Sequence, residues 1–338
     1  MTCKIATYEC HPMMRVLTNA PGFLILLVGV ILFAYWKPGL GAEIRILNNQ
    51  YLQKFIIVII FFVQGSRLKT ENLWQLFRRP VGIVFLQVGI IILPVIWVKL
   101  GWVLEWVPQV YYASFFFMAI LPTTISSCVV FSANAGGNAE YALGHATLSN
   151  LLGILLVPFL WHGSFPMESS SGFLFAKIFA LVMAPCLLGW ILNRIFPAVT
   201  KFAGKEWYGQ VPMLGIALLV YLSMCEGLFM QERKIFLSML SELFPYCLTF
   251  VLLFHLSGWV FSTRWSKKKE IQVSQFFCLS QKSLAMGLPI ASILFAESEE
   301  NLFSITLPLF CVHFLQLLVG TLFLNVWKRR VEATENGK

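Results

Sequence analysis

Long runs of apolar residues alternate with short polar or charged connections along the whole chain. Ten of these runs have about the length of a membrane span: 20–36, 50–66, 80–99, 110–134, 138–161, 171–195, 207–227, 243–263, 271–295 and 302–326. A transmembrane helix needs about 20 residues, and fewer where flanking side chains reach back to the interface. The pattern therefore predicts an all-α polytopic membrane protein with ten transmembrane helices.

Polar residues interrupt the fourth and the ninth of these runs. The fourth contains Pro122-Thr123-Thr124-Ile125-Ser126-Ser127 and ends at Gly136-Gly137-Asn138, and the ninth contains Ser280-Gln281-Lys282-Ser283. In a bilayer, unpaired backbone is tolerated only where it is buried in protein or lines a wet cavity. We therefore expect two broken helices, and paired interruptions at matching places in two halves indicate the binding site of a transporter.

The ten runs divide into two halves of five, 1–165 and 166–338, and the second half ends in a short polar tail. Because five is odd, the second half enters the membrane with the opposite orientation, as in an inverted repeat. A short similarity supports duplication. The second run ends at Gln64-Gly65 and the seventh at Glu226-Gly227, and an amphipathic connector ending at Pro80 or Pro245 follows each.

The composition agrees with a membrane protein. Only 12% of the residues are charged and 58% are hydrophobic, whereas a soluble domain has about 25% charged residues. The net charge of +9 does not indicate nucleic-acid binding, because the basic residues lie in short loops between apolar runs. The eight cysteines lack the spacing of a zinc site or a disulfide framework, so no metal or other cofactor is expected.

The basic residues also predict the orientation of the helices. With ten helices, 17 of the 25 lysines and arginines fall on one side of the membrane and 7 on the other, and Lys282 lies within a helix. Loops rich in lysine and arginine stay in the cytoplasm. We therefore expect a multi-pass protein of the cell membrane (inner or plasma membrane) with both termini in the cytoplasm.

Lys282 is the most informative single residue, because it lies eleven residues into the run that begins at Ile271. A lysine at the centre of a membrane helix costs about 2.5–3.5 kcal/mol, which favours an inward, partnered or wet position. Snorkelling to an interface is the alternative, and from this depth the side chain would have to reach across several helical turns.

The polar residues at and around the two interruptions are candidate ligands for a substrate or ion. They carry hydroxyl or amide groups: Thr123, Thr124, Ser126, Ser127, Asn138, Asn150, Gln281, Ser283 and Gln87. Lys282 belongs to the same site, and Lys282, His145 and Glu226 are candidates for a proton-linked role. The alternatives are close helix packing by the small residues, ordinary burial of His145, an interhelical hydrogen bond from Gln87, and an interfacial position for Glu226.

At these residues the chain resembles the bile acid–sodium symporter family, solute carrier family 10, and within it the member-7-like branch. The resemblance covers nearly the whole chain. It is densest at 121–130, 135–138 and 281–289, and the segment Gly65-Ser66-Arg67-Leu68-Lys69-Thr70-Glu71 also fits. It implies ten helices in two inverted five-helix repeats, with a panel domain against a core domain in which the broken fourth and ninth helices cross.

In sodium-coupled members of that family, two sodium ions lie behind the crossing and organic anions bind in front of it. By resemblance, Ser126 and Ser127 match the polar pair after the first break, Gln281 matches the glutamine at the second, and Gln87 matches a sodium-site glutamine. Two positions depart from the pattern: Phe277 stands where those members carry glutamate, and Lys282 where they carry asparagine. An ammonium repels a cation, so the sequence predicts that Lys282 supplies a fixed positive charge and that coupling is to protons or absent.

The sequence thus predicts a secondary transporter of a small organic anion that works by alternating access, as a monomer or homodimer in the bilayer, with no cofactor and with sodium or a proton as a possible coupling ion. A non-transporting, regulatory membrane protein of the same fold, linked to calcium homeostasis, is the alternative. An enzyme that uses Lys282 as a nucleophile is not expected, because no base or metal constellation accompanies the lysine.

Overall fold

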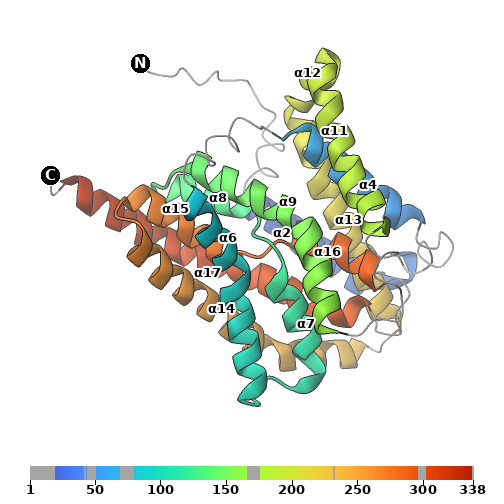
Figure 1. Cartoon of the computed structure of the whole chain (residues 1–338). Coiled ribbons are helices and arrows are strands. Elements are labelled where there is room, and N and C mark those ends of the chain that lie inside the picture. Colours follow the sequence, from blue (N-terminus) through green and yellow to red (C-terminus); the bar gives the residue numbers. More distant parts are fainter. Residues whose placement is uncertain are drawn as a thin grey trace.

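The computed structural model describes residues 20–41, 43, 51–68, 80–165, 176–230, 233–295 and 302–336, and the regular structure in these ranges is helical, without strands (Figure 1). The helices run in the order α2 (Ala20–Trp36), α4 (Tyr51–Ser66), α6 (Pro80–Val103), α7 (Gln109–Ile120), α8 (Ile125–Asn134), α9 (Ala139–Ser164), the π-helical turn η1 (Phe179–Met183), α11 (Ala184–Ile195), α12 (Pro197–Ala203), α13 (Glu206–Met230), α14 (Arg233–Trp265), α15 (Lys269–Ser280), α16 (Leu284–Leu294) and α17 (Leu302–Asn336). The all-α prediction is confirmed.

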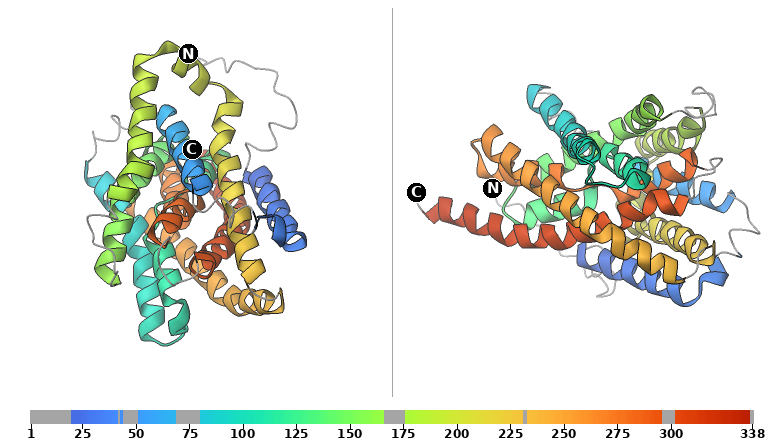
Figure 2. Two further views of the ribbon diagram at one scale, coloured as in Figure 1. Left: turned by 90° about the vertical axis from the view of Figure 1, so that its right-hand side faces the viewer. Right: turned by 90° about the horizontal axis from the view of Figure 1, so that it is seen from below.

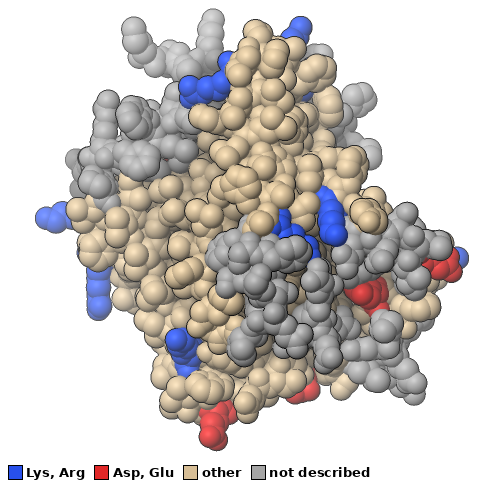
Figure 3. Space-filling view, turned by 45° about the vertical axis from the view of Figure 1, so that its right-hand side comes forward, with Lys and Arg blue, Asp and Glu red and all other residues tan. Residues whose placement is uncertain are grey.

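Seven helical segments in the described ranges are long and apolar enough to cross a membrane, and the number is eight if α7 and α8, which meet at a bend of 62°, form one span. Two more apolar helices, Ile25–Trp36 and Tyr51–Ser66, are shorter. Most of the described atoms visible in Figure 3 belong to residues other than Lys, Arg, Asp and Glu. The structure is that of a multi-pass membrane protein, and the count of ten spans stays a prediction.

The helices form two groups that meet side by side (Figures 1 and 2). In the first group α4 packs against α11, α12 and α13, and α2 packs against α13. In the second, α14 and α15 pack together, α15 packs against α8 and α9, and α17 packs against α7, α8 and α14. Contacts of α13 with α16 and α17 join the groups, so a site between them has walls from both.

Two segments are more helical than the sequence predicts. The predicted connector before Pro245 is the first part of α14, because its apolar face is buried, with Phe236 packed against Phe303 at a ring distance of 5.7 Å. The polar tail, 331–338, continues α17 to Asn336, and Trp327, four residues before the tail, is fully buried against Trp259. Most of the first predicted connector, 69–79, lies outside the described residues.

Two glycines let α4 and α11 approach closely. A Cβ at Gly65 would overlap the carbonyl oxygen of Cys186, and a Cβ at Gly189 would overlap the carbonyl oxygen of Phe62. Small residues at such positions are a principal means of packing helices in membranes, where no hydrophobic effect drives helices together.

Gly189→Leu is therefore expected to destabilise the protein by about 1–3 kcal/mol or more, because a side chain there has to displace backbone. The thermal-unfolding midpoint of the purified protein measures this. Gly82→Leu in α6 is the matched control, since a Cβ at Gly82 meets nothing within 4 Å. Equal midpoints for the two variants would refute the close contact.

Candidate functional site

The two interruptions predicted from the sequence lie against each other in the structure. Helix ends at Ile120 and resumes at Ile125, and it ends again at Ser280 and resumes at Leu284. The backbone N–H of Ser283 donates to the carbonyl of Pro122 at 2.9 Å, and the Ser127 hydroxyl donates to Gln281 Oε1 at 3.2 Å. Segments about 160 residues apart in the chain thus form one polar centre.

Lys282 is completely buried at this centre, and its ammonium group is enclosed by backbone. Nζ donates to the carbonyl oxygens of Ile90 at 2.7 Å, Ala119 at 2.8 Å and Leu121 at 2.8 Å. A lysine ammonium has three N–H donors and no acceptor. Three carbonyls therefore match its donors one for one, and we refer to this arrangement as the carbonyl cage.

Each carbonyl of the cage lacks the helical partner that it would otherwise have. Ile90 lies four residues before Pro94, which has no N–H to donate to the Ile90 carbonyl. Ala119 and Leu121 lie at the C-terminal end of α7, where the last carbonyls of a helix have no intrahelical donor. The proline in α6 and the end of α7 thus supply acceptors, and Lys282 satisfies them.

The backbone of Lys282 has a partner of its own, Gln316 of α17. Gln316 Oε1 accepts from the Lys282 N–H at 2.7 Å, and its Nε2 donates to the Lys282 carbonyl at 2.8 Å. The same Nε2 lies 2.8 Å from His313 Nδ1. One amide side chain thereby satisfies both the N–H and the carbonyl of Lys282 in the interruption between α15 and α16.

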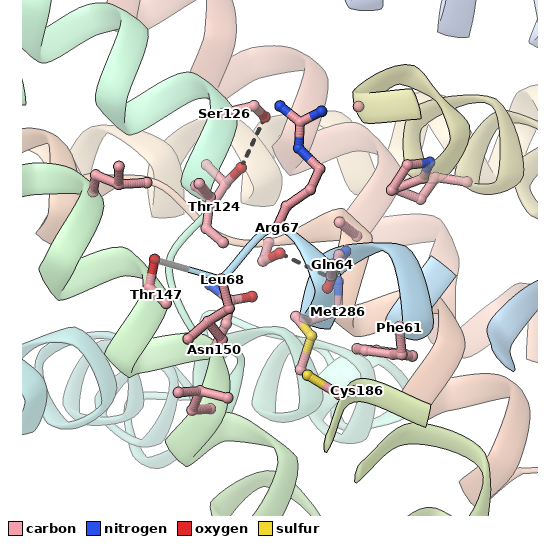
Figure 4. Close-up of a pocket in the computed structure, with 18 of the residues that line it drawn as sticks. Phe61, Gln64, Arg67, Leu68, Thr124, Ser126, Thr147, Asn150, Cys186 and Met286 are labelled. Atoms are coloured by element: carbon pink, nitrogen blue, oxygen red, sulfur yellow. Dashed lines mark hydrogen bonds between the residues drawn. The ribbon is translucent and has the colours of Figure 1, made fainter. Parts of the chain in front are cut away.

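A pocket of about 470 Å³ opens beside this centre, between the two groups of helices (Figure 4). Its walls come from α4, α11 and α13 of the first group and from α8, α9 and α16 of the second. The polar side chains that line it are Gln64, Arg67, Thr124, Ser126, Thr147, Asn150 and Ser283. The remainder of the lining is mainly apolar, and a concave, mostly apolar site with a few polar groups is typical of small-molecule binding.

Comparison with known sequences agrees with this architecture. The sequence model of the SBF-like CPA transporter family matches residues 21–329, nearly the whole chain. The chain belongs to this family.

Among the relatives of this SBF-like CPA transporter is the protein named putative symporter YfeH of Escherichia coli (strain K12), 28% identical over 324 residues that cover 92% of this chain and 93% of the relative. The sodium/bile acid cotransporter 7 of Danio rerio is 28% identical over 317 residues (89% and 92%). That of Rattus norvegicus is 26% identical over 338 residues (93% and 94%). The resemblance to the bile acid–sodium symporter family is confirmed, and the family is one of transporters, not of enzymes.

The predicted site residues of this SBF-like CPA transporter fall into three places. Thr124, Ser126, Asn150 and Ser283 line the pocket. Thr123, Ser127, Gln281 and Lys282 lie where the two interruptions meet instead, and their side chains are buried. The structure thus differs from the expectation that Lys282 faces the anion, because the carbonyl cage takes all three of its donors.

The remaining predicted residues contact neither the cage nor the pocket. Gln87 donates to the His145 carbonyl at 3.0 Å and joins α6 to α9. Asn138 caps α9 by accepting from the Tyr141 N–H at 2.8 Å. Glu226 lies on α13, half-buried and away from the pocket lining. For Gln87, the alternative interpretation of an interhelical hydrogen bond describes the observed geometry.

Arg67 and Gln316 were not among the site residues predicted from the sequence. Arg67 carried a signal, since it directly follows an apolar run in a segment that the family resemblance includes. The sequence signal for Gln316 was weaker, because it is only a single amide residue within the apolar tenth run. Phe277, at the position where sodium-coupled relatives carry glutamate, is fully buried, and its ring lies 5.3 Å from that of Phe131.

Proposed function

We propose that this protein is a secondary transporter that moves a small organic anion across the cell membrane by alternating access and does not use sodium. The observation that carries the proposal is the carbonyl cage around Lys282 Nζ, directly beside a pocket between two groups of helices. A pocket in that position can be opened to either side when one group moves against the other.

In transporters with broken helices, backbone carbonyls at the breaks coordinate the coupling cation. Here the Lys282 ammonium occupies such carbonyls and is tethered to the chain, so it cannot dissociate during a transport cycle. The packing of the Phe277 ring against Phe131 also supports transport without sodium, because a benzyl side chain provides no oxygen ligand for a hard cation. The fixed charge holds the crossing together, and no proton or sodium ion has to be bound there.

The remaining parts of the proposal follow from the sequence. The alternating movement would relate two inverted repeats, 1–165 and 166–338, each of five spans, with panel and core domains corresponding to the first and second groups of helices. Both termini would be cytoplasmic in the cell membrane, and no cofactor is required. The described lining of the pocket comes from a single chain, so the carrier can act as a monomer or within a homodimer.

The proposal is tested by ligand-induced thermal stabilisation of the purified protein across a panel of organic anions, in sodium buffer and in N-methylglucamine buffer. We expect some anions to stabilise the protein equally in both buffers, since the cation is built in. Uptake of the stabilising anion into proteoliposomes should likewise be unchanged when sodium is replaced.

If anions stabilise the protein only when sodium is present, the proposal that the Lys282 ammonium takes the place of sodium is wrong. A sodium dependence of the parent protein that Gln281→Ala removes would contradict that proposal most directly, because it would place a sodium site beside Gln281. If no anion binds at all, the non-transporting regulatory function is the better reading of the fold.

A further inference from the structure

We propose that Arg67 is the residue that binds the anionic group of the substrate in the pocket between the two groups of helices. This inference rests on the proposed transport of an organic anion and assigns a binding residue to the pocket.

Arg67 is held at the pocket by contacts with α13 and the residue before it. Its Nη1 donates to the carbonyl of Lys205 at 3.2 Å, and the guanidinium lies against Gly209, where a Cβ would overlap it. A guanidinium has five N–H donors. Among the described residues the Lys205 carbonyl accepts from one of them, which leaves donors of the planar fork for a ligand.

The charge of the pocket favours an anion with a single negative charge. Among its described lining residues Arg67 is the one with a formal charge, and none is Asp or Glu. In the part of the chain that the structure describes, no carboxylate forms an ion pair with Arg67. A bidentate pair of arginine with a carboxylate, sulfonate or phosphate oxygen pair is among the strongest polar contacts available to such a cation.

The rest of the pocket divides into a polar and an apolar part. Figure 4 shows the Arg67 side chain extending toward Thr124 and Ser126, whose hydroxyls lie 3.4 Å from each other, while Phe61, Cys186 and Met286 lie away from the guanidinium. Ile154, Met213 and Ile216 extend the apolar lining. An anionic head beside Arg67 with an apolar body along these side chains would fill both parts.

The position of Arg67 also connects the substrate with movement. Arg67 follows α4 in the first group of helices, whereas Thr124 and Ser126 begin α8 in the second. An anion that accepts hydrogen bonds from Arg67 and from the hydroxyls of Thr124 and Ser126 would draw the two groups of helices together. Without the anion, the positive charge of Arg67 faces the positive N-terminal end of the α8 dipole, and the two do not attract each other. Occupancy of the pocket would thereby favour its closure.

The test uses the full-length protein in nanodiscs of uncharged phospholipid and two probes of nearly the same shape, naphthalene-2-sulfonate and the neutral naphthalene-2-sulfonamide. Isothermal titration calorimetry should show the sulfonate binding at least about tenfold more tightly, a difference of about 1.4 kcal/mol. Arg67→Gln should remove this preference and leave the affinity for the sulfonamide unchanged. Arg67→Lys should restore part of it, because the charge returns without the planar fork.

Arg264→Gln is the matched control, since Arg264 is exposed at the end of α14 and outside the pocket. It should keep the full preference for the sulfonate. Equal affinity for both probes, a preference that survives Arg67→Gln, or no binding of the sulfonate at millimolar concentration overturns the inference. Binding through Arg67 without any uptake into proteoliposomes would instead refute the transport function and leave the assignment of Arg67 standing.

Discussion

Lys282→Met is expected to abolish transport and to destabilise the protein by about 3 kcal/mol or more, because three buried carbonyls lose their donor and each such loss costs about 1–3 kcal/mol. Methionine has nearly the length of lysine without its N–H groups, so the change isolates the hydrogen bonds to Ile90, Ala119 and Leu121. The thermal-unfolding midpoint and proteoliposome uptake measure the two effects.

Lys99→Met is the matched control, since Lys99 is exposed near the end of α6, and it should leave both measurements nearly unchanged. Removing a buried charge also removes the cost of desolvating it, and that gain opposes the loss of hydrogen bonds. A Lys282→Met protein as stable as the parent would mean that desolvation outweighs the cage, and the account of Lys282 as a structural cation would then be wrong.

The shorter variant Lys282→Ala carries a further expectation. It leaves a space lined by the three carbonyls of the cage, and carbonyl oxygens are the ligands by which proteins replace the hydration shell of a monovalent cation. Sodium should therefore stabilise Lys282→Ala against heat while leaving the parent unaffected. Lack of any sodium effect on this variant would count against the idea that the ammonium substitutes for an ion.

Gln316→Leu is expected to have the second-largest effect, a destabilisation of about 2–4 kcal/mol, because the N–H and the carbonyl of Lys282 both lose their partner at a fully buried position. Leucine keeps most of the side-chain volume, so packing changes little. With its backbone released, Lys282 would no longer be held in register with the cage, and uptake should fall with stability.

Gln275→Leu makes the same substitution at another buried glutamine of the second group. Gln275 donates a single hydrogen bond, to the Tyr141 hydroxyl at 3.1 Å, and holds no backbone group in the interruption. Gln275→Leu should therefore lower the free energy of unfolding clearly less than Gln316→Leu does. If the two variants are equally stable, Gln316 is an ordinary buried amide and the interruption is supported by other contacts.

Hydrophobic patterning was sufficient for the broad architecture. Runs such as 80–99 and 207–227 predicted helices that the structure contains, because in lipid every backbone group must be satisfied within the segment and a helix does this locally. The interruptions at 121–124 and 281–283 could be located for the same reason, since proline and clustered polar residues remove or compete with local hydrogen bonds. The extents of α14 and α17 could not, because burial of Phe236 and Trp327 decides them.

For the chemistry of the site, too, some features could be predicted from the sequence and others depended on the tertiary structure. Sequence alone indicated that Lys282 lies deep within an apolar run and needs partners. Pro94, which the sequence prediction did not use, leaves the Ile90 carbonyl without its helical donor. Only the tertiary structure decided that these two meet, since Ile90 and Lys282 are 192 residues apart. It also directed the ammonium into the cage instead of the pocket and brought Arg67 to the pocket in its place. Local sequence fixes which groups lack a hydrogen-bond partner, but the path of the chain in space fixes which partner reaches them.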